Sequence, residues 1–252
     1  YSHKNLQKLL NIVLLNNNNY KISKIAEMSD ESISLNTKEL AFNQTSIEES
    51  INSFKISMFK FDKTLFNNTY NKLLSEKTFR DIFKETFIPF LEHIGLLWQT
   101  DTLSPAHEHF ISNLISQKIQ INTEKIQYNG TVNDKTYVLF LPENEIHDLG
   151  VLYLNYELVL RGQNTIYLGQ SLPLDNLNYF FEVNKNICFI TSMTVKPYDH
   201  EITDYFAELD AILKNTNHSV IAIGKKAMNF SSHKFQSQIS VYPTVSELLK
   251  EL

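Results

Sequence analysis

The sequence is poor in cysteine and glycine, and it has no long apolar run. Cys188 is its single cysteine, so a disulfide framework is excluded and a reducing, cytoplasmic compartment is expected. No apolar stretch approaches the ~20 residues of a membrane-spanning helix, and no signal-peptide pattern opens the chain. With only six glycines in 252 residues, each glycine is a candidate for a position that has no room for a side chain.

Charge and motif content narrow the possible functions further. The formal net charge is −5, which argues against strong nucleic-acid binding by this chain. The sequence contains no P-loop, no C-x-x-C pair and no nucleophile–His–Asp order, so no separate catalytic activity is predicted. With 42% hydrophobic and 20% charged residues, the composition is that of an ordinary globular protein of one to two domains.

The first half of the chain has helical periodicity. Residues 1–29 predict two short helices, and residues 30–45 are polar throughout, which predicts an irregular linker. From residue 46 to residue 122, apolar side chains recur every three or four positions in four successive segments. Four helices with short joints predict a four-helix bundle, and most of its aromatic side chains are expected in the core. The segments cover about 46–61, 66–74, 79–97 and 104–115.

The second half, residues 131–252, alternates strand and helix patterns. A polar stretch at 123–134 contains Asn-Gly and Asn-Asp turn signals and marks the domain boundary. The alternation predicts a doubly wound α/β domain with the flavodoxin-like strand order 2-1-3-4-5. Strands are expected at 136–141, 165–168, 187–191, 219–223 and 238–241, with helices at about 147–160, 173–183, 200–213 and 244–252.

One short motif follows the first predicted strand: Glu145-Ile146-His147-Asp148-Leu149-Gly150. A carboxylate two residues before a histidine can hold one ring nitrogen and leave the other free for a metal. Gly150 would let a bulky ligand approach the backbone. Taken alone the pattern is weak, because a histidine at the end of a strand is usually an ordinary surface residue.

Two further polar elements follow later strands. Ser192-Met193-Thr194 comes 41 residues (151–191) after Gly150, and Gly224-Lys225 comes a further 29 residues (195–223) along the chain. All three elements fall at the carboxyl ends of predicted strands. Ligands of open α/β sheets bind outside these strand ends, so the three elements are expected to converge on one site.

The bundle carries a fourth element, in which nine residues separate Trp98 from Glu108-His109. The Glu-x-His-x-x-Gly, Ser-x-Thr and Gly elements, at their spacing, resemble the cobalamin-binding pattern. The Trp-x9-Glu-His element resembles the helical half of cobalamin-binding domains in MerR-type transcriptional regulators, a class that includes the light-sensing CarH type. The resemblance covers nearly the whole chain. A purely structural alternative for Trp98 is that it caps the bundle core.

The resemblance implies a cobalamin, most of all adenosylcobalamin, bound between the bundle and the α/β domain. His147 would be the lower cobalt ligand in place of the cofactor's own base, and Glu145 would hold the other ring nitrogen. The displaced nucleotide tail would meet Ser192 and Thr194, and Gly224 would let backbone pass close to it. The residues implied at the upper face are Trp98, Pro105, Glu108 and His109.

The same resemblance implies a regulator. Residues 1–29 look like the end of a winged helix-turn-helix domain whose recognition helix would precede Tyr1. Promoter DNA would then be a partner only of a longer chain, and self-association into a homo-oligomer is expected to respond to the upper ligand. An ordinary helical hairpin is the alternative for residues 1–29.

Two positions depart from the family pattern. Lys225 stands where the family has a second glycine, and it could crowd the nucleotide tail or meet its phosphate. Gln99 stands where light-sensing members have a histidine that binds cobalt after photolysis, although His107 or His109 could substitute. Two alternatives therefore stay open besides a cobalamin-dependent regulator: a regulator that has lost the cofactor, and a corrinoid carrier of a methyltransferase system.

Overall fold

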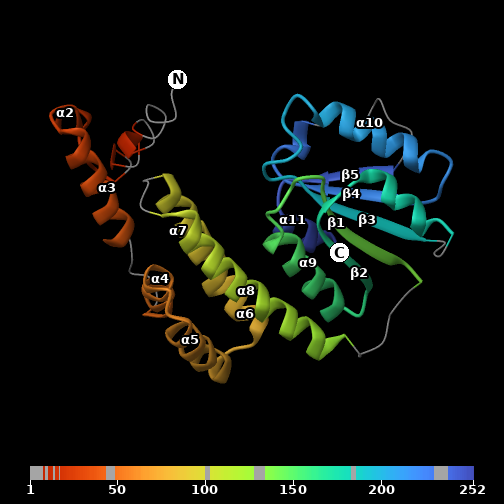
Figure 1. Ribbon diagram of the computed structural model, residues 1–252, viewed down its shortest axis with the longest axis horizontal. Helices are drawn as coiled ribbons and strands as arrows, with labels where there is room; N and C mark the ends of the chain where they lie inside the picture. Colours follow the sequence, from red (N-terminus) through yellow and green to blue (C-terminus); the bar gives the residue numbers. More distant parts are fainter. Residues whose placement is uncertain are drawn as a thin grey trace. The chain divides into compact units, whose positions relative to one another are not determined.

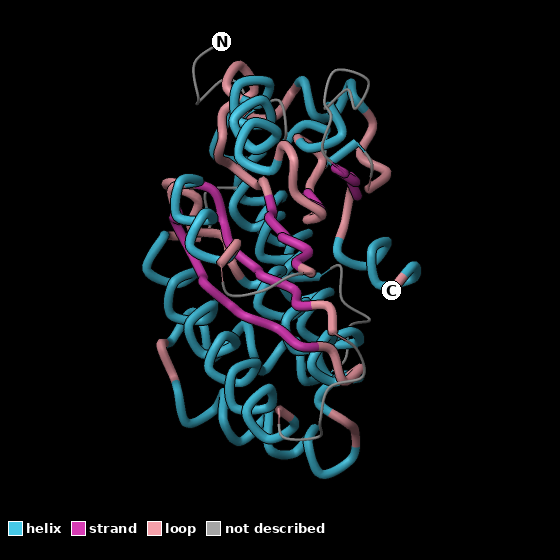
Figure 2. Tube along the Cα trace, turned by 90° about the vertical axis from the view of Figure 1, so that its right-hand side faces the viewer, coloured by secondary structure: helices cyan, strands magenta, loops and turns pink. Residues whose placement is uncertain are grey.

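The computed structural model describes residue 8 and residues 11–13, 15–16, 18–43, 49–99, 103–127, 134–182, 186–229 and 238–252. The chain divides into two compact units, Tyr1–Ile115 and Ser116–Leu252, which are described separately. Helices make up the regular structure of the first unit, whereas the strands all belong to the second (Figures 1 and 2). None of the described helices is both long and apolar enough to cross a membrane.

In the first unit, residues 11–13 and 15–16 are helical, and α2 (Ile22–Ala26) and α3 (Asp30–Asn43) follow. The linker predicted at 30–45 is therefore wrong over residues 30–43, which are helical. The polar side chains that suggested irregular structure are satisfied inside the helix: Asn36 Nδ2 donates to the Ser32 carbonyl at 2.8 Å, and Thr37 Oγ1 donates to the Ile33 carbonyl at 2.6 Å. Acidic residues in the first turn also favour the positive end of the helix dipole.

The predicted bundle helices are present. They are α4 (Glu49–Lys60), α5 (Lys63–Glu76), α6 (Phe79–Ile82), the π-helical turn η1 (Phe83–Phe87), α7 (Ile88–Gln99) and α8 (Pro105–Ile126). Asp62 caps α5 by accepting from the Leu65 N–H at 2.9 Å. Pro105 occupies the first position of α8, where its missing N–H has no intrahelical partner to lose.

One helix predicted at 79–97 is in fact interrupted by the π-helical turn. In η1 the Ile88 N–H bonds to the Phe83 carbonyl, five residues back. The cause lies one residue on, at Pro89, which has no N–H and whose ring would clash with the carbonyl four residues back in a regular α-helix. The wider turn keeps the helical path continuous around the proline.

The bundle core is aromatic, as predicted. Phe54, Phe66, Phe87 and Phe90 have no exposed surface. The Phe54 ring centroid lies 5.0 Å from that of Phe66 and 5.3 Å from that of Phe87. Such tilted pairs add to the stabilisation that burial itself provides.

The second unit contains a five-stranded parallel sheet in the order β2-β1-β3-β4-β5, which confirms the predicted topology. Its strands are β1 (Thr136–Pro142), β2 (Asn164–Leu172), β3 (Ile187–Ser192), β4 (Ser219–Ile223) and β5 (Gln238–Tyr242). The helices are α9 (Leu149–Leu160), α10 (Ile202–Leu213) and α11 (Val245–Glu251), with short 3₁₀ helices η2 (Leu174–Phe180) and η3 (Ala227–Asn229). The helix predicted at 173–183 is thus the 3₁₀ helix η2.

Helices cover both faces of this sheet. Figure 1 shows α10 on one side of the strands and α9 with α11 on the other. Phe206 and Leu209 of α10 pack with Leu177 of η2 in one core, and Leu154 of α9 packs with Leu248 of α11 in the other. β1 is buried along its whole length because both faces are covered. The carboxyl ends of the strands therefore form the edge at which a site can be built.

Candidate functional site

The site is organised by Glu145, which lies in the loop between β1 and α9. Its side chain is 1% exposed. Oε1 accepts from the Ile146 N–H at 2.9 Å, the His147 N–H at 3.0 Å and His147 Nδ1 at 2.6 Å. One carboxylate oxygen therefore fixes both the backbone and the imidazole ring of the motif.

The other carboxylate oxygen holds a second loop, the one that follows β3. Glu145 Oε2 accepts from the N–H groups of Thr194, Val195 and Lys196 at 3.1, 2.6 and 2.8 Å. Three successive N–H groups that converge on one oxygen form an anion-binding nest. Glu145 thus joins two loops that are about fifty residues apart in sequence.

These hydrogen bonds decide the ionisation state of Glu145. Burial by itself would raise the pKa of the carboxyl group. The hydrogen bonds from the Lys196 N–H, the His147 ring and N–H, and the Val195 N–H outweigh burial and lower the pKa to about 2. The carboxylate is therefore ionised at neutral pH.

An ionised Glu145 selects one tautomer of His147. Because Oε1 can only accept, Nδ1 carries the proton and donates it to Glu145, so Nε2 is left with its lone pair. The His147 side chain is 41% exposed, which makes the ring accessible to a ligand. This orientation is the one predicted for a histidine that binds a metal through Nε2.

Each of the two loops that Glu145 joins carries an exposed apolar side chain. Ile146 is 54% exposed and Val195 is 44% exposed, and the backbone N–H of each residue donates to the Glu145 carboxylate. Exposed apolar side chains on the loops that hold an accessible imidazole suit an apolar ring system better than a hydrated ion.

The other predicted elements of the α/β unit lie at the same edge. Ser192 ends β3 and is half-buried, while Thr194 is exposed and gives its N–H to Glu145. Gly224 follows β4 with φ +124°, and an added Cβ would lie 2.3 Å from the Met193 carbonyl oxygen. The glycine is therefore required by the close approach of the loops after β3 and β4.

Gly150, at the start of α9, is different. An added Cβ there would meet only Val245 Cγ2 of α11, at an ordinary contact distance of 3.8 Å. Its backbone is helical, and helix interiors favour alanine over glycine. The fold itself thus gives no reason for a glycine at position 150, whereas a ligand that approaches this surface would.

The predicted upper-face residues belong to the first unit. Pro105, Glu108 and His109 lie in the first turns of α8, with Pro105 and His109 exposed and Glu108 half-buried. The side chains of Trp98 and Gln99, at the end of α7, lie outside the described residues.

His107 in the same turn of α8 has partners of its own. It stacks on Phe61 with ring centroids 4.8 Å apart, and its Nδ1 lies 2.8 Å from Ser104 Oγ. Phe61 has a φ of +52°, which a phenylalanine rarely adopts. The packing on His107 holds Phe61 in place despite this backbone conformation.

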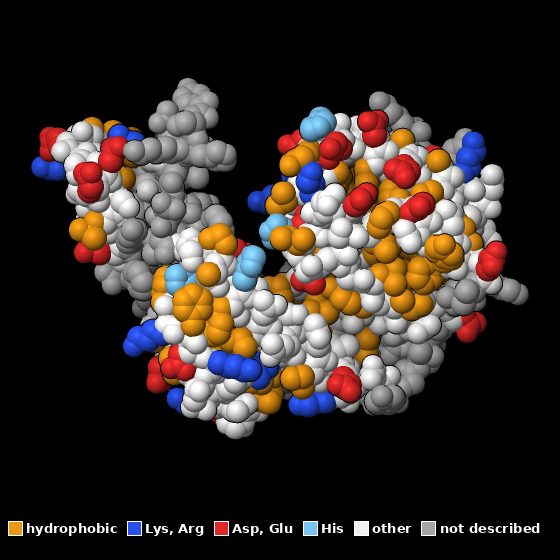
Figure 3. Space-filling view, viewed as in Figure 1, with side chains coloured by type: hydrophobic (Ala, Val, Ile, Leu, Met, Phe, Trp, Pro, Cys, Tyr) orange, Lys and Arg blue, Asp and Glu red, His pale blue; other side chains and the backbone are white. Residues whose placement is uncertain are grey.

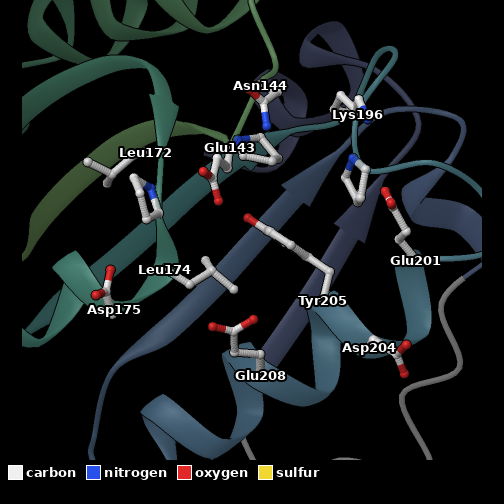
Figure 4. Close-up of a pocket in the computed structure, with 13 residues that line it drawn as sticks. Glu143, Asn144, Leu172, Leu174, Asp175, Lys196, Glu201, Asp204, Tyr205 and Glu208 are labelled. Carbon is white, nitrogen blue, oxygen red and sulfur yellow. The ribbon is translucent and has the colours of Figure 1, made fainter.

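A cavity of about 550 Å³ opens at the same edge of the sheet, on the side of α10 (Figure 4). Tyr205 reaches into it from α10, and Lys196 lies at its rim. Five carboxylates line it, against the single ammonium of Lys196, and Figure 3 shows acidic side chains gathered over α10. They belong to Glu143, Asp175, Glu201, Asp204 and Glu208. The cavity does not include His147, and its charge disfavours anionic ligands.

Some groups that shape the site carried no signal in the sequence. The N–H groups of Val195 and Lys196 come from a loop that no motif marks, since a backbone donor can be supplied by almost any residue. Lys226 donates from Nζ to the Val195 carbonyl at 2.7 Å, whereas the neighbouring Lys225 is exposed. The described residues contain no group of three or more His, Cys, Asp or Glu side chains that could hold a metal ion by themselves.

Residues 50–121 match the family described as B12 binding domain. No curated protein matches the sequence. The structure of the Methanosarcina barkeri monomethylamine corrinoid protein is similar, with a TM-score of 0.63 and 13% identity, over 81% of this chain and 96% of that one.

Two further solved structures are more distant. A cobalamin-binding protein from Desulfitobacterium hafniense has a TM-score of 0.39 and 13% identity over 81% of this chain and 96% of its own. The methanol:cobalamin methyltransferase complex MtaBC from Methanosarcina barkeri has a TM-score of 0.41 and 13% identity over 92% of this chain and 90% of its own. Both TM-scores are too low to support an argument.

The chain therefore has the cobalamin-binding fold, with an N-terminal helical region followed by a five-stranded parallel sheet. The match to the family described as B12 binding domain lies in its helical part, at 50–121.

Glu145→Gln should change how the stability of the α/β unit depends on pH. The folded-state pKa of about 2 lies below the ordinary value of 4.5, so the carboxylate stabilises the fold fully above pH 4.5 and loses this effect as the pH falls to about 2. The expected contribution is on the order of 3 kcal/mol. Unfolding free energies measured between pH 7 and pH 2 should fall less steeply for Glu145→Gln than for the unaltered chain. Glu143→Gln, at an exposed carboxylate, serves as the control; equal slopes for all three chains would contradict the assignment.

Proposed function

We propose that this chain binds cobalamin with His147 as the lower cobalt ligand and serves as a corrinoid carrier of a methyltransferase system. The observation that carries the proposal is the 2.6 Å contact between His147 Nδ1 and an ionised Glu145, which leaves Nε2 free and accessible at the ligand-binding edge of the sheet. The B12 binding domain match at 50–121 supplies independent support.

Each residue of the two loops has a part in this proposal. His147 Nε2 provides the lone pair for the metal, and Glu145 fixes the tautomer and the orientation of the ring. Ile146 and Val195 offer apolar contact to the macrocycle. The bound cofactor would supply a cobalt centre that accepts and releases a methyl group. The protein residues bind it, orient it and set its lower ligand.

The nucleotide tail is proposed to lie on the side of α9 and α11. Gly150 and Val245 approach each other there, and neither the backbone nor the packing requires the glycine. The cavity beside α10 is disfavoured because its five carboxylates would repel the phosphate of the tail. Ser192 and Thr194 remain the proposed hydrogen-bonding groups for the tail, and Gly224 its close backbone neighbour.

The residues proposed for the upper face are Trp98, Pro105, Glu108 and His109, all within the matched segment 50–121. The upper ligand of the cobalt, adenosyl or methyl, depends on which of the two functions the protein has. A carrier requires the methyl form, whereas a sensor of the regulator type would use adenosylcobalamin.

The regulator hypothesis rests on residues 1–29 and on the resemblance of the Trp98 and Glu108-His109 element to MerR-type regulators; of residues 1–29 the structure describes 8, 11–13, 15–16 and 18–29. The similarity in fold to a monomethylamine corrinoid protein favours the carrier. A selection for bound sequences from random DNA with the full-length protein separates the two, because a regulator enriches an operator and a carrier does not.

His147→Ala should remove the axial nitrogen from bound cobalamin. The visible spectrum of the complex should become that of cobalamin with no lower nitrogen ligand, and the affinity should fall roughly 10-fold or more. His200→Ala, at a side chain that is 79% exposed, should change neither. Spectra and dissociation constants recorded by titration of each chain with cobalamin provide the test. An unaltered spectrum and affinity in His147→Ala would sink the ligand assignment.

Gly150→Ala should impair binding of the nucleotide tail without harming the fold. The added methyl meets only Val245 Cγ2 at 3.8 Å, so the unfolding free energy should stay within about 1 kcal/mol of that of the unaltered chain. Cobalamin should bind more weakly, whereas cobinamide, which lacks the nucleotide, should bind as before. Equal losses for both ligands, or no loss for cobalamin, would place the tail elsewhere.

A further inference from the structure

Lys226 lies two residues after Gly224, and its side chain is only 25% exposed. Its ammonium donates to the Val195 carbonyl at 2.7 Å and to the Pro197 carbonyl at 3.3 Å, and it lies 3.3 Å from Asp199 Oδ1. An ammonium group has three donors, and three acceptors of one loop meet them. Lys226 therefore holds the loop after β3 from the side of β4.

The same loop is held from the opposite side by Glu145. The Val195 carbonyl and the Lys196 N–H belong to one peptide group, because they flank the same C–N bond. The carbonyl accepts from Lys226 at 2.7 Å, and the N–H donates to Glu145 Oε2 at 2.8 Å. A single peptide group is thus bound by a cation at its oxygen and by an anion at its nitrogen.

Hydrogen bonds to charged groups are about twice as strong as neutral ones, and bonds in a chain polarise one another. An ammonium at the oxygen of a peptide group draws electron density towards it and makes its N–H a better donor. The Glu145 carboxylate then gains a stronger partner without direct contact with a positive side chain. Lys226 acts as the counter-charge of a buried carboxylate through one intervening peptide group.

We propose that Lys226 is a positioning residue for His147. The connection runs from Lys226 through the Val195–Lys196 peptide group to Glu145 Oε2, and from Glu145 Oε1 to His147 Nδ1. Lys226 fixes the loop that fixes the carboxylate, and the carboxylate fixes the tautomer and direction of the ring. Its role in cofactor binding rests on the proposed function, whereas its effect on Glu145 and His147 belongs to the protein alone.

The neighbouring lysine provides a matched control. Lys225 is exposed, so Lys225→Met removes the same charge one residue away without removing the link to the loop. Lys226→Arg keeps a positively charged donor, so it tests whether such a donor at position 226 is enough to hold the loop after β3. Lys226→Gln keeps a neutral donor, and it replaces Lys226→Met if that variant does not fold.

The test begins on the chain without cofactor. Amide hydrogen exchange reports on the Lys196 N–H, and ¹⁵N chemical shifts of the imidazole report on the His147 tautomer. In Lys226→Met we expect the Lys196 amide to exchange roughly 10-fold faster or more, and the Nε2-protonated tautomer of His147 to appear. Lys225→Met should match the unaltered chain, and Lys226→Arg should restore most of the protection. The Phe189 amide in β3 should be unchanged throughout, which separates the local effect from a loss of global stability.

The second half of the test adds cobalamin. Lys226→Met should lower the fraction of bound cofactor with a nitrogen lower ligand, as measured by its visible spectrum. If Lys226→Met matches Lys225→Met in exchange and tautomer, the positioning role is overturned, whatever the cofactor does. If these two readouts change as expected but the unaltered chain binds no cobalamin, the positioning role stands and the proposed function fails.

Discussion

The Glu145 carboxylate accepts hydrogen bonds from five backbone N–H groups and one ring nitrogen, while its side chain is 1% exposed. A buried charge is costly unless its hydrogen-bonding capacity is filled, and here the loops after β1 and β3 must both adopt their observed paths to fill it. The direction of the His147 ring follows from this constraint. So does the path of the loop at 194–196, which Lys226 holds from the other side.

The topology, and the placement of the motif elements at one edge of the sheet, could be predicted from the sequence because they depend on patterns of short range. Apolar runs of five or six residues alternate with helical patterns, and this fixes a parallel sheet whose carboxyl ends gather the motifs. The Glu145–His147 contact is also local, since two residues separate them. Residues 30–43 were predicted wrongly because polar side chains such as Asn36 and Thr37 can bond to helix carbonyls as readily as to turns.

The remaining features depend on contacts between distant residues. Nothing in the sequence pairs Glu145 with backbone N–H groups about fifty positions away. Lys225 drew attention because it occupies the place of a glycine, yet Lys226 is the lysine that contacts the loop. Gly224 was expected beside a cofactor, and the structure gives a nearer reason, the Met193 carbonyl 2.3 Å from a hypothetical Cβ.

In the proposed function, the cofactor supplies the cobalt and the protein supplies one ligand to it, His147. The protein needs to supply only one accessible nitrogen in a fixed tautomer, apolar contact for the macrocycle and room for the displaced tail. The residues proposed for these three roles lie at one edge of one sheet: His147, Ile146 with Val195, and Gly150. Such a set of contacts would hold the cofactor of a carrier on the protein while its upper ligand is exchanged.

The most direct test is electron paramagnetic resonance of cob(II)alamin bound to chain whose histidines are labelled with ¹⁵N. A lower ligand from His147 Nε2 predicts that the threefold splitting by a ¹⁴N nucleus in the unlabelled complex becomes a twofold splitting in the labelled one. A splitting that stays threefold after labelling would show that the cofactor keeps its own base, and it would contradict the account. The absence of any nitrogen splitting would contradict it equally.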